Sequence, residues 1–422
     1  MKYDKLGNLC LVKGGKRLPK GKALLDYKTE HPYLRITDYA SGNIDLKNLK
    51  YISNDVFDSI SKYTINKKDI FLSIVGTIGI VDIIDEKLDG ASLTENAVKI
   101  IVKDRTKIDV NYLAYYLKST MGQYEIDIRT VGSTQKKLAI TRIKDIPVPV
   151  IEINKQRKIA SVLSSLDSKI KLNNQIISNL EELSSTLFKR WFVDFEFPDE
   201  NGNPYKSSGG KMDDSEFGEI PECFQVKKLS DIADVIGGGT PSKKVKEYFE
   251  DGNISWITPK DLSINKNIFI DRGKTSITRL GLNKSSAKLL PKNSILFSSR
   301  APIGYTAISK NELATNQGFK SLIALDGIPY QFIFHFIRNN VSKFESIATG
   351  STFKEVSGTA VKNFKIVLPT EEVLQNYADV TSPLFKKIKI VEEENNILTE
   401  LRDSLLPKLL SGEIELPEDE EA

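Results

Sequence analysis

The sequence repeats itself at long range, and this repeat constrains the fold more than any other feature. Residues 5–19 read KLGNLCLVKGGKRLP and residues 228–241 read KLSDIADVIGGGTP. Further along, GSTQK at 132–136 has a counterpart in GSTFK at 350–354. The matching pieces lie roughly 220 residues apart, far more than the ~20–50 residues of solenoid repeats. Each copy is therefore expected to be a domain, and the chain to present two similar surfaces to a partner with two similar sites.

A long amphipathic helix is predicted after each copy. Residues 155–193 and 372–411 carry apolar side chains spaced by four and three, the pattern of a coiled-coil seam, so we expect an antiparallel pair. Pro383 predicts a kink or a late start, Pro407 should disturb the last turns, and Gly412 should end the helix. The predicted seam residues are Ile159, Leu163, Leu166, Ile170, Asn173, Ile177, Leu180, Leu187, Leu384, Ile388, Val391, Asn395, Leu398 and Leu405.

The globular parts mix short strands with helices, which indicates an α+β fold. Segments such as DIFLSIVG and NSILFSSR read as strands, and residues 112–120 and 330–340 read as helices with an aromatic inner face. The fold class expected is thus α+β, with two similar globular domains separated by two long antiparallel coiled-coil helices in a pseudo-twofold repeat. The predicted divisions are 1–152 (first domain), 153–205 (central helix and linker), 206–370 (second domain) and 371–422 (second helix with an acidic tail).

Charge is distributed unevenly along the chain. Lys and Arg exceed Asp and Glu by six in 1–152 and by seven in 206–370, whereas 371–422 has nine more acidic than basic residues. Basic domains suit a polyanion, although such a surplus also occurs in proteins that bind no nucleic acid. The longest uncharged run, at 70–81, is too short to span a bilayer, so no membrane segment is expected. With two cysteines and no signal peptide evident, a cytoplasmic location is expected.

The motifs of common enzyme chemistry are missing from the sequence. The two histidines and two cysteines show no metal-ligand spacing, and neither a P-loop nor a GxGxxG string occurs. We therefore expect no catalytic residue, metal or cofactor on this chain, and a binding protein in preference to an enzyme.

The candidate ligand contacts lie in the repeated loops and in two further segments, FSSRAPIG and ATNQGF. Glycine flexibility, hydroxyls and lysines suit phosphate or base contacts, while amide and guanidinium groups can contact adenine or guanine in a bidentate manner. Plain turns with solvated lysines are the alternative. The predicted DNA-binding residues are Lys16, Arg17, Ser133, Thr134, Gln135, Lys136, Thr240, Ser242, Lys243, Lys260, Ser299, Arg300, Asn316, Gln317, Ser351, Thr352 and Lys354.

Taken together, these segments resemble the specificity subunit of type I restriction–modification systems. The resemblance covers nearly the whole chain. It is carried by GGGTPSK (237–243), YFEDGNISWITPKDL (248–262), ATNQGFKSL (314–322), the helix at 156–198 and LRDSLLPKLLSGEI (401–414). The first copy matches more weakly, because SIVGTIG replaces the SRAPIG segment.

The resemblance implies that each globular part is a target-recognition domain. Each would read one half of a split site in double-stranded DNA, and the helix pair would set the spacer. Two methyltransferase subunits, carrying S-adenosylmethionine, would methylate adenine N6, and restriction subunits would use ATP and Mg²⁺ to cleave. This chain would then direct its partners without catalysis of its own.

Two other functions are compatible with the sequence. One is a specificity subunit that serves a methyltransferase lacking a nuclease partner. The other is a coiled-coil scaffold that binds proteins through two basic domains. Sequence-selective retention of DNA would separate the scaffold from the other two.

Overall fold

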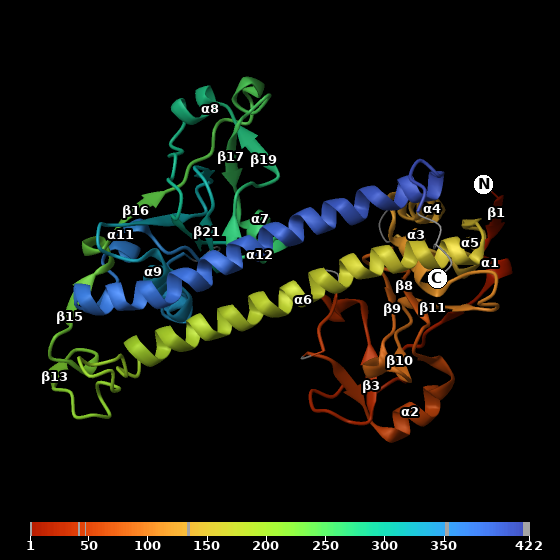
Figure 1. The fold of residues 1–422 in the computed structure, drawn as a ribbon, viewed down its shortest axis with the longest axis horizontal. Helices are drawn as coiled ribbons and strands as arrows, with labels where there is room; N and C mark the ends of the chain where they lie inside the picture. Colours follow the sequence, from red (N-terminus) through yellow and green to blue (C-terminus); the bar gives the residue numbers. More distant parts are fainter. Residues whose placement is uncertain (1, 41–42, 47, 133–135, 351–353, 417–422) are drawn as a thin grey trace, which may run out of the picture. The chain divides into compact units, whose positions relative to one another are not determined.

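The computed structural model describes residues 2–40, 43–46, 48–132, 136–350 and 354–416. Its contacts divide the chain into two units (Figure 1). Unit 1 comprises Met1–Lys171 and Asn396–Ala422, and unit 2 comprises Leu172–Asn395. Each unit holds one globular domain and one part of each long helix, α6 (Ile153–Phe192) and α12 (Glu371–Ser411). The domain divisions expected at 152, 205 and 370 remain a prediction. The contacts divide the chain within the two long helices and so do not test these divisions.

The globular part of unit 1 contains two four-stranded sheets. An antiparallel sheet has the order β2-β11-β8-β9, and a mixed sheet has the order β6-β3-β10-β7, with β10 parallel to β3. Strand β8 is buried throughout, as expected of an apolar run that sits inside a sheet. The bounds are β2 (Cys10–Gly14), β11 (Ala97–Val102), β8 (Ile70–Ser73), β9 (Val81–Ile83), β6 (Lys50–Ile52), β3 (His31–Leu34), β10 (Ala91–Leu93) and β7 (Thr64–Ile65).

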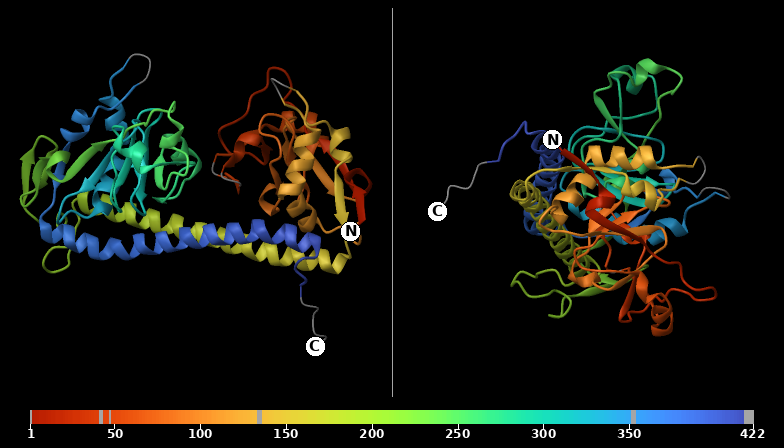
Figure 2. Two further views of the ribbon diagram at one scale, coloured as in Figure 1. Left: turned by 90° about the horizontal axis from the view of Figure 1, so that it is seen from above. Right: turned by 90° about the vertical axis from the view of Figure 1, so that its right-hand side faces the viewer.

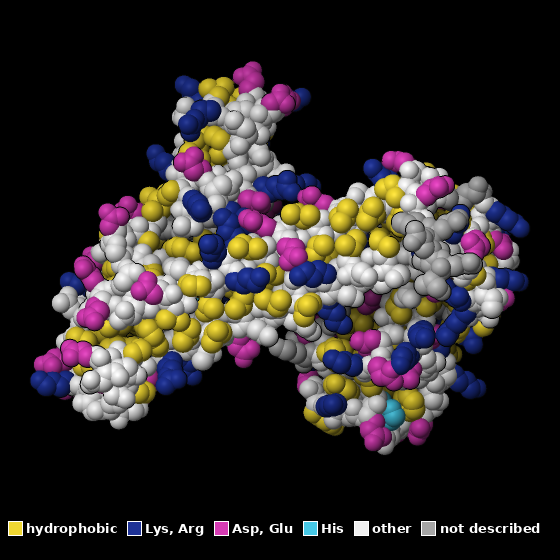
Figure 3. All heavy atoms as spheres, in the orientation of Figure 1, with side chains coloured by type: hydrophobic (Ala, Val, Ile, Leu, Met, Phe, Trp, Pro, Cys, Tyr) yellow, Lys and Arg dark blue, Asp and Glu magenta, His cyan; other side chains and the backbone are white. Residues whose placement is uncertain are grey.

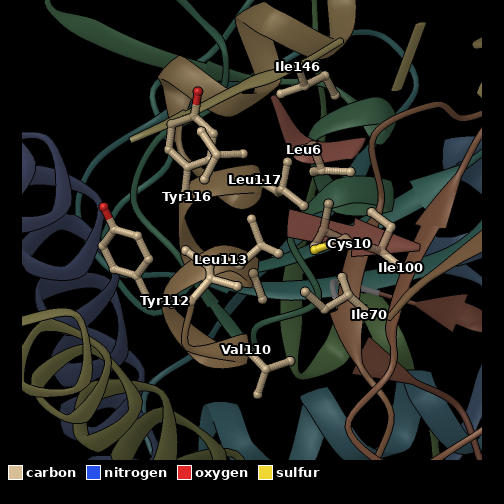
Figure 4. Close-up of a cluster of buried hydrophobic side chains, with 14 of the residues drawn as sticks. Leu6, Cys10, Ile70, Ile100, Val110, Tyr112, Leu113, Tyr116, Leu117 and Ile146 are labelled. Atoms are coloured by element: carbon tan, nitrogen blue, oxygen red, sulfur yellow. The ribbon is translucent and has the colours of Figure 1, made fainter. Parts of the chain in front are cut away.

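Helix α3 (Val110–Lys118) fills the core of unit 1. Asp109 precedes the helix, and its carboxylate accepts hydrogen bonds from the backbone N–H groups of Asn111 and Tyr112 and so caps the helix. Its inner face carries the aromatic residues that the sequence predicted, with Tyr112 and Tyr116 almost fully buried (Figure 4). The remaining elements are β1 (Lys2–Lys5), α1 (Leu6–Leu9), β4 (Tyr39–Ala40), β5 (Asn43–Ile44), α2 (Asn54–Ile60), α4 (Thr120–Arg129), α5 (Ile140–Lys144) and β12 (Pro147–Val150).

Unit 2 repeats this arrangement with a longer sheet. Its five-stranded sheet has the order β16-β23-β20-β21-β18, and a three-stranded sheet has the order β19-β17-β22. The bounds are β16 (Ala233–Gly237), β23 (Lys320–Ala324), β20 (Ile295–Ser299), β21 (Ile303–Ser309), β18 (Phe269–Ile270), β19 (Thr275–Ile277), β17 (Ile254–Ile257) and β22 (Ala314–Thr315). The others are β13 (Met212–Ser215), β14 (Gly218–Pro221), β15 (Gln225–Lys228), α7 (Pro259–Ile264), α8 (Arg279–Asn283), α9 (Tyr330–Asn339), α10 (Val341–Ser346), α11 (Gly358–Lys362) and β24 (Lys365–Leu368).

The internal repeat of the sequence is a repeat of strand pairing. Strands β2, β11, β8 and β9 occupy the places that β16, β23, β20 and β21 occupy in unit 2, and β10 pairs in parallel with β3 as β22 does with β17. The predicted α+β class with two similar domains and two long antiparallel helices is therefore confirmed.

Within each unit, parts of α6 and α12 lie side by side in opposite directions. In unit 1, Asp167 of α6 accepts hydrogen bonds from Arg402 of α12 at 2.9 Å and from Tyr115 of α3 at 2.7 Å. In unit 2, the Asn173 amide donates to Glu394 at 2.9 Å and to Asn395 at 3.0 Å. These pairs run in opposite order along the two helices, as antiparallel packing requires.

The seam is less uniform than its periodicity suggests. Nine of the predicted positions on α6 and α12 are half-buried, because the globular domain covers these helices from one side only, as Figure 2 shows for unit 2. Polar contacts such as those of Asp167 and Asn173 also interrupt the seam. In α12 the sequence did not predict Phe385, which is fully buried, whereas its predicted neighbour Leu384 is half-buried. Of the predicted seam residues, Ile159, Leu163, Asn173, Ile388 and Val391 are buried, whereas Leu166, Ile170, Ile177, Leu180, Leu187, Leu384, Asn395, Leu398 and Leu405 are not fully so.

The prolines do not delay or end the second helix. Helix α12 begins at Glu371 and passes through both Pro383 and Pro407, so the late start expected at Pro383 is wrong. Pro383 is exposed, and water can therefore hydrate the carbonyl group that loses its partner. The helix ends at Ser411, and Gly412 has a φ of 78°, the left-handed conformation typical of a helix C-terminus.

A buried glutamate attaches α12 to the sheet of unit 2. The Glu392 side chain is fully buried and accepts hydrogen bonds from the backbone N–H groups of Ile268, at 2.7 Å, and Phe269, at 3.2 Å. Burial raises the pKa of Glu392 to about 8, against the opposing effects of these two bonds and of Lys310. The contact therefore connects the edge strand β18 to the helix through a carboxyl group that titrates near neutral pH.

Glu392 predicts a dependence of stability on pH. Because its pKa is higher in the folded state than in the unfolded chain, folding binds a proton between about pH 4.5 and pH 8. This group's contribution to the free energy of unfolding should therefore decrease as pH rises through that window. Urea denaturation at pH 5.5 and pH 8 should show the decrease in the natural protein and a smaller one in Glu392→Gln, which has no titrating carboxyl. Equal slopes in the two proteins would contradict the prediction.

Candidate nucleic-acid interface

In the first domain, strand β2 ends in glycines that let the chain cross a neighbouring loop. A Cβ atom on Gly15 would lie 2.0 Å from the carbonyl oxygen of Thr94, so a side chain cannot be accommodated there without a backbone shift. The next residue, Lys16, donates its N–H to Leu93 O at 2.8 Å. The hydroxyl of Tyr33, a buried residue, donates to Lys16 O at 2.8 Å. The crossing thus has a defined backbone conformation and leaves the Lys16 side chain exposed.

An ion pair lies directly after this crossing. The Arg17 side chain is 81% exposed and donates from Nε to Glu95 Oε1 at 2.7 Å. Glu95 also accepts from the Thr94 hydroxyl at 3.2 Å. Burial alone would raise the pKa of Glu95, but the hydrogen bond from Arg17 and further bonds outweigh it and lower the pKa, so the carboxylate is ionised at neutral pH. The pair borders a surface hollow of about 370 Å³ that Tyr33 and Arg35 also line.

The second domain builds the same crossing with other residues. A Cβ atom on Gly238 would lie 2.0 Å from Asn316 O, as on Gly15 in the first domain. Gly239 donates its N–H to Thr315 O at 2.9 Å, and the Trp256 indole donates to Gly239 O at 2.9 Å. A tryptophan therefore takes the place of Tyr33, and the backbone hydrogen bonds are kept.

At the position of the ion pair, the second domain carries uncharged groups. The Thr240 hydroxyl donates a hydrogen bond to the Gln317 side-chain oxygen. The predicted residues Ser242, Lys243 and Lys260 are exposed nearby in sequence, with Lys260 in the first turn of α7. The structure thus brings together Thr240 and Gln317, which are 77 residues apart.

In each of the repeated GST loops, two backbone hydrogen bonds join the residues at the two ends of the loop. Val131 and Lys137 exchange two backbone hydrogen bonds, at 2.9 and 2.8 Å, and Thr349 and Glu355 do the same at 3.0 and 2.8 Å. Gly132 has a φ of 106° in the first of these loops. The predicted contacts Ser133, Thr134, Gln135, Ser351 and Thr352 lie outside the described residues, whereas Lys136 and Lys354 are described and exposed.

Arg300, predicted to contact guanine, is engaged in an ion-pair network. Its Nη1 lies 3.3 Å from Glu355 Oε2, and Lys320 Nζ lies 2.9 Å from Glu355 Oε1. Two cations share one carboxylate in this network, so a contact with DNA would have to compete with Glu355. Ser299 is fully buried, and its hydroxyl donates to Gly318 O at 3.2 Å. A buried hydroxyl with a backbone partner is poorly placed for the DNA contact expected of Ser299, which stays a prediction.

The SIVGTIG segment of the first domain forms the same turn as SRAPIG. In the second domain, Tyr305 N donates to the Ser298 hydroxyl at 2.8 Å, and in the first domain Ile80 N donates to the Ser73 hydroxyl at 2.8 Å. This equivalence places Val75 where the second domain has Arg300. The two domains therefore keep the backbone and differ in the side chains at the surface.

The bidentate adenine contact predicted for Asn316 conflicts with a local bond. Its Oδ1 accepts the backbone N–H of Gly318 at 2.9 Å and so helps to shape the turn before β23. Gln317 is exposed and remains the better candidate of the two amides.

The sequence did not point to four residues of this surface. Glu95 and Glu355, which orient cationic side chains, and the aromatic pair Tyr33 and Trp256 were not predicted to belong to it. These residues come to lie beside the predicted contacts because strands far apart in sequence pair with one another. The local motifs do not indicate that pairing. Among the described residues, no group of three or more His, Cys, Asp or Glu side chains is placed to hold a metal ion. In the same part of the chain, no helix has the length and apolar character needed to cross a bilayer.

Fold and surface together define a duplicated recognition protein, in which one backbone frame carries a different set of exposed hydrogen-bonding groups in each copy. The chain belongs to the family described as the type I restriction modification DNA specificity domain, whose model matches residues 1–182 and 221–400. The match falls twice, once on each copy of the repeat.

Individual relatives are similar over different lengths. The MjaIX type I restriction enzyme specificity subunit of Methanocaldococcus jannaschii is 40% identical over 190 residues, which is 44% of this chain and 44% of that protein. The HindI specificity subunit of Haemophilus influenzae is 25% identical over 355 residues, 72% of this chain and 76% of the relative. The crystal structure of a type I restriction–modification S subunit from M. genitalium has the same fold, with a TM-score of 0.58 at 16% identity over 97% of this chain and 95% of that one.

Proposed function

We propose that this chain is the DNA-recognition subunit of a type I restriction–modification complex. Each domain would read one half of a bipartite target in double-stranded DNA. The observation that carries this proposal is the family match to both copies, combined with equivalent backbone frames that carry different exposed side chains. Two unlike readers on one frame are what a target with two unlike halves requires.

Methylation and cleavage would belong to partner subunits. The relatives are named as specificity subunits of type I restriction enzymes, which supports a chain that directs partners without catalysis of its own. It would assemble with two methyltransferase subunits that carry S-adenosylmethionine and with restriction subunits that use ATP and Mg²⁺. The complex would act on DNA in the cytoplasm. Family membership does not favour the coiled-coil scaffold, and the choice between a complete system and one without a nuclease depends on which partners the cell supplies.

Exposed apolar side chains on the long helices support a role in assembly. In unit 2, Leu172 and Leu183 of α6 and Ile390 of α12 are 52%, 47% and 48% exposed. In unit 1, Ile397 of α12 is 65% exposed. Yellow hydrophobic side chains follow both helices in the space-filling view (Figure 3). Exposed apolar side chains can form protein–protein contacts, and these would serve the partner subunits.

The helices would set the gap between the half-sites. Removing seven residues from α6 and seven from the facing part of α12 shortens the pair by roughly 10 Å, at ~1.5 Å per residue, and keeps the heptad phase. Mapping of methylated adenines, with the chain co-expressed with its methyltransferase subunit, should show a bipartite site whose gap is a few base pairs shorter. The half-site sequences should stay the same. Altered half-sites with an unchanged gap would contradict the proposal, and a seven-residue deletion in the acidic tail serves as the control.

A further inference from the structure

The two domains place a side-chain pair at one equivalent position. Arg17 lies two residues after Gly15 in the first domain, and Thr240 lies two residues after Gly238 in the second. Their partners are Glu95, which follows Thr94, and Gln317, which follows Asn316; a Cβ atom added to Gly15 or Gly238 would lie 2.0 Å from the carbonyl oxygen of Thr94 or Asn316. Arg17 and Glu95 form an ion pair, whereas Thr240 and Gln317 share an uncharged hydrogen bond.

The surrounding hydrogen bonds show that this equivalence is structural. The backbone N–H of Lys16 donates to the last residue of β10 at 2.8 Å, and that of Gly239 donates to the last residue of β22 at 2.9 Å. Their carbonyl groups accept from Tyr33 and Trp256 at 2.8 and 2.9 Å. The same frame therefore holds a charged pair in one domain and a neutral pair in the other.

We propose that these pairs are matched specificity determinants, Arg17 with Glu95 reading a guanine in one half-site and Gln317 with Thr240 reading an adenine in the other. The proposal rests on the proposed function, and it assigns a base to one position of each half-site.

The geometry of the first pair suits guanine. Glu95 binds Arg17 through Nε, which leaves the two terminal guanidinium nitrogens to donate in parallel. Guanine offers two acceptors, O6 and N7, at its major-groove edge, and the arginine fork matches them. The carboxylate also reduces the rotamer freedom that Arg17 would lose on binding. A carboxylate of this kind orients the reading group and need not contact the base itself.

The geometry of the second pair suits adenine. The Thr240 hydroxyl donates to Gln317 Oε1 and fixes the orientation of the amide. The amide nitrogen can then donate to adenine N7, while the free lone pair of Oε1 accepts from the N6 amino group. Gln317 is exposed and can reach a base edge.

An exposed ion pair without a reading role would predict different behaviour. Such pairs contribute little to stability, and removing one would change neither the folding of unit 1 nor the sequence that it recognises. A phosphate contact by Arg17 would be independent of sequence, and lysine would replace arginine at little cost.

The test exchanges the pairs between the domains in the full chain, in complex with its methyltransferase subunit. The double variant Arg17→Thr with Glu95→Gln should change one position of the first half-site from guanine to adenine and leave the second half-site unchanged. We expect discrimination at that position to shift on the order of tenfold to a hundredfold. The reciprocal variant, Thr240→Arg with Gln317→Glu, should change one position of the second half-site from adenine to guanine. Binding to duplex libraries randomised at each position measures both.

Controls separate the possible failures. Lys5 and Asp145 form an exposed ion pair at 2.8 Å elsewhere in unit 1, and Lys5→Thr with Asp145→Gln should leave both half-sites unchanged. Arg17→Lys keeps the charge and should still lose the guanine preference. This single substitution also tests the inference if the double variant does not fold. An unchanged half-site in Arg17→Lys or in the double variant would overturn the inference. Absence of any sequence preference in the natural complex would instead overturn the proposed function.

Discussion

Gly238→Ala should abolish recognition of the second half-site, while Gly237→Ala, a change at the adjacent glycine, should preserve it. A Cβ atom at position 238 would lie 2.0 Å from Asn316 O and 2.5 Å from the Thr315 hydroxyl, and real Cβ atoms do not approach other atoms so closely. Because the first of these atoms belongs to the backbone, the connection between β22 and β23 must move. A Cβ atom at Gly237 meets no atom within 4 Å.

The displacement would reach the reading surface directly. The connection that must move carries Gln317, whose oxygen accepts the Thr240 hydroxyl. We expect a loss of about 1–3 kcal/mol in the stability of the domain, as for other overpacked sites, together with loss of the second half-site from the methylation pattern. Urea denaturation measures the first effect, and mapping of methylated adenines measures the second. Equal behaviour of the two alanine variants would show that the crossing does not position the surface.

The first domain offers an independent repetition of this comparison. Gly15→Ala would place a Cβ atom 2.0 Å from Thr94 O, whereas at Gly14 it would lie 3.5 Å from the end of the Ile140 side chain, an ordinary contact. Gly15→Ala should therefore affect the first half-site alone and Gly14→Ala neither. Loss of both half-sites from either substitution would indicate a general failure of folding.

Phe385→Ala should have the largest effect on stability, about 3–5 kcal/mol, as is typical of a buried phenylalanine. Phe385 lies on α12, is fully buried, and its ring centroid is 5.7 Å from that of Phe334 and 5.6 Å from that of His335, both on α9. It also packs edge-on against Phe269 of the edge strand β18, with ring centroids 6.3 Å apart. The ring thus joins the long helix to the sheet of unit 2, and its removal leaves a cavity between three elements.

Ile390→Ala is the matched control, because Ile390 lies on the same helix and is 48% exposed. Urea denaturation should show a small change for this variant and a large one for Phe385→Ala. Backbone amide hydrogen exchange in unit 2 should be faster in Phe385→Ala than in Ile390→Ala. If the two variants lost similar stability, the helix would contribute through its own propensity and not through this packing.

Repeats and periodicities could be read from the sequence because they are local or self-similar. The four-and-three spacing located both long helices, and the repeated loops located the two domains. The fully buried Phe385 was missed, because the spacing could not indicate which side of α12 the sheet domain covers. The late start expected at Pro383 does not occur, because packing of the helix on the core outweighs one lost hydrogen bond on an exposed face.

The candidate contacts stay predictions, but the structure shows how the segments that carry them fold. The GGK and GGGTP segments do form equivalent crossings, yet Ser299 is buried in β20, and Arg300 is bound to Glu355. The partners of the exposed side chains lie far away in sequence, as Glu95 does from Arg17. No periodic pattern in the sequence indicates that such residues meet.

The sequence by itself determined the number of domains, the long helices and the family, because these depend on patterns that repeat along the chain. The tertiary structure alone decided which side chains meet at the surface. The Arg17–Glu95 and Thr240–Gln317 pairs exist because strands pair across 77 or more residues, and the free energy of that pairing comes from burial of the core and not from any local preference.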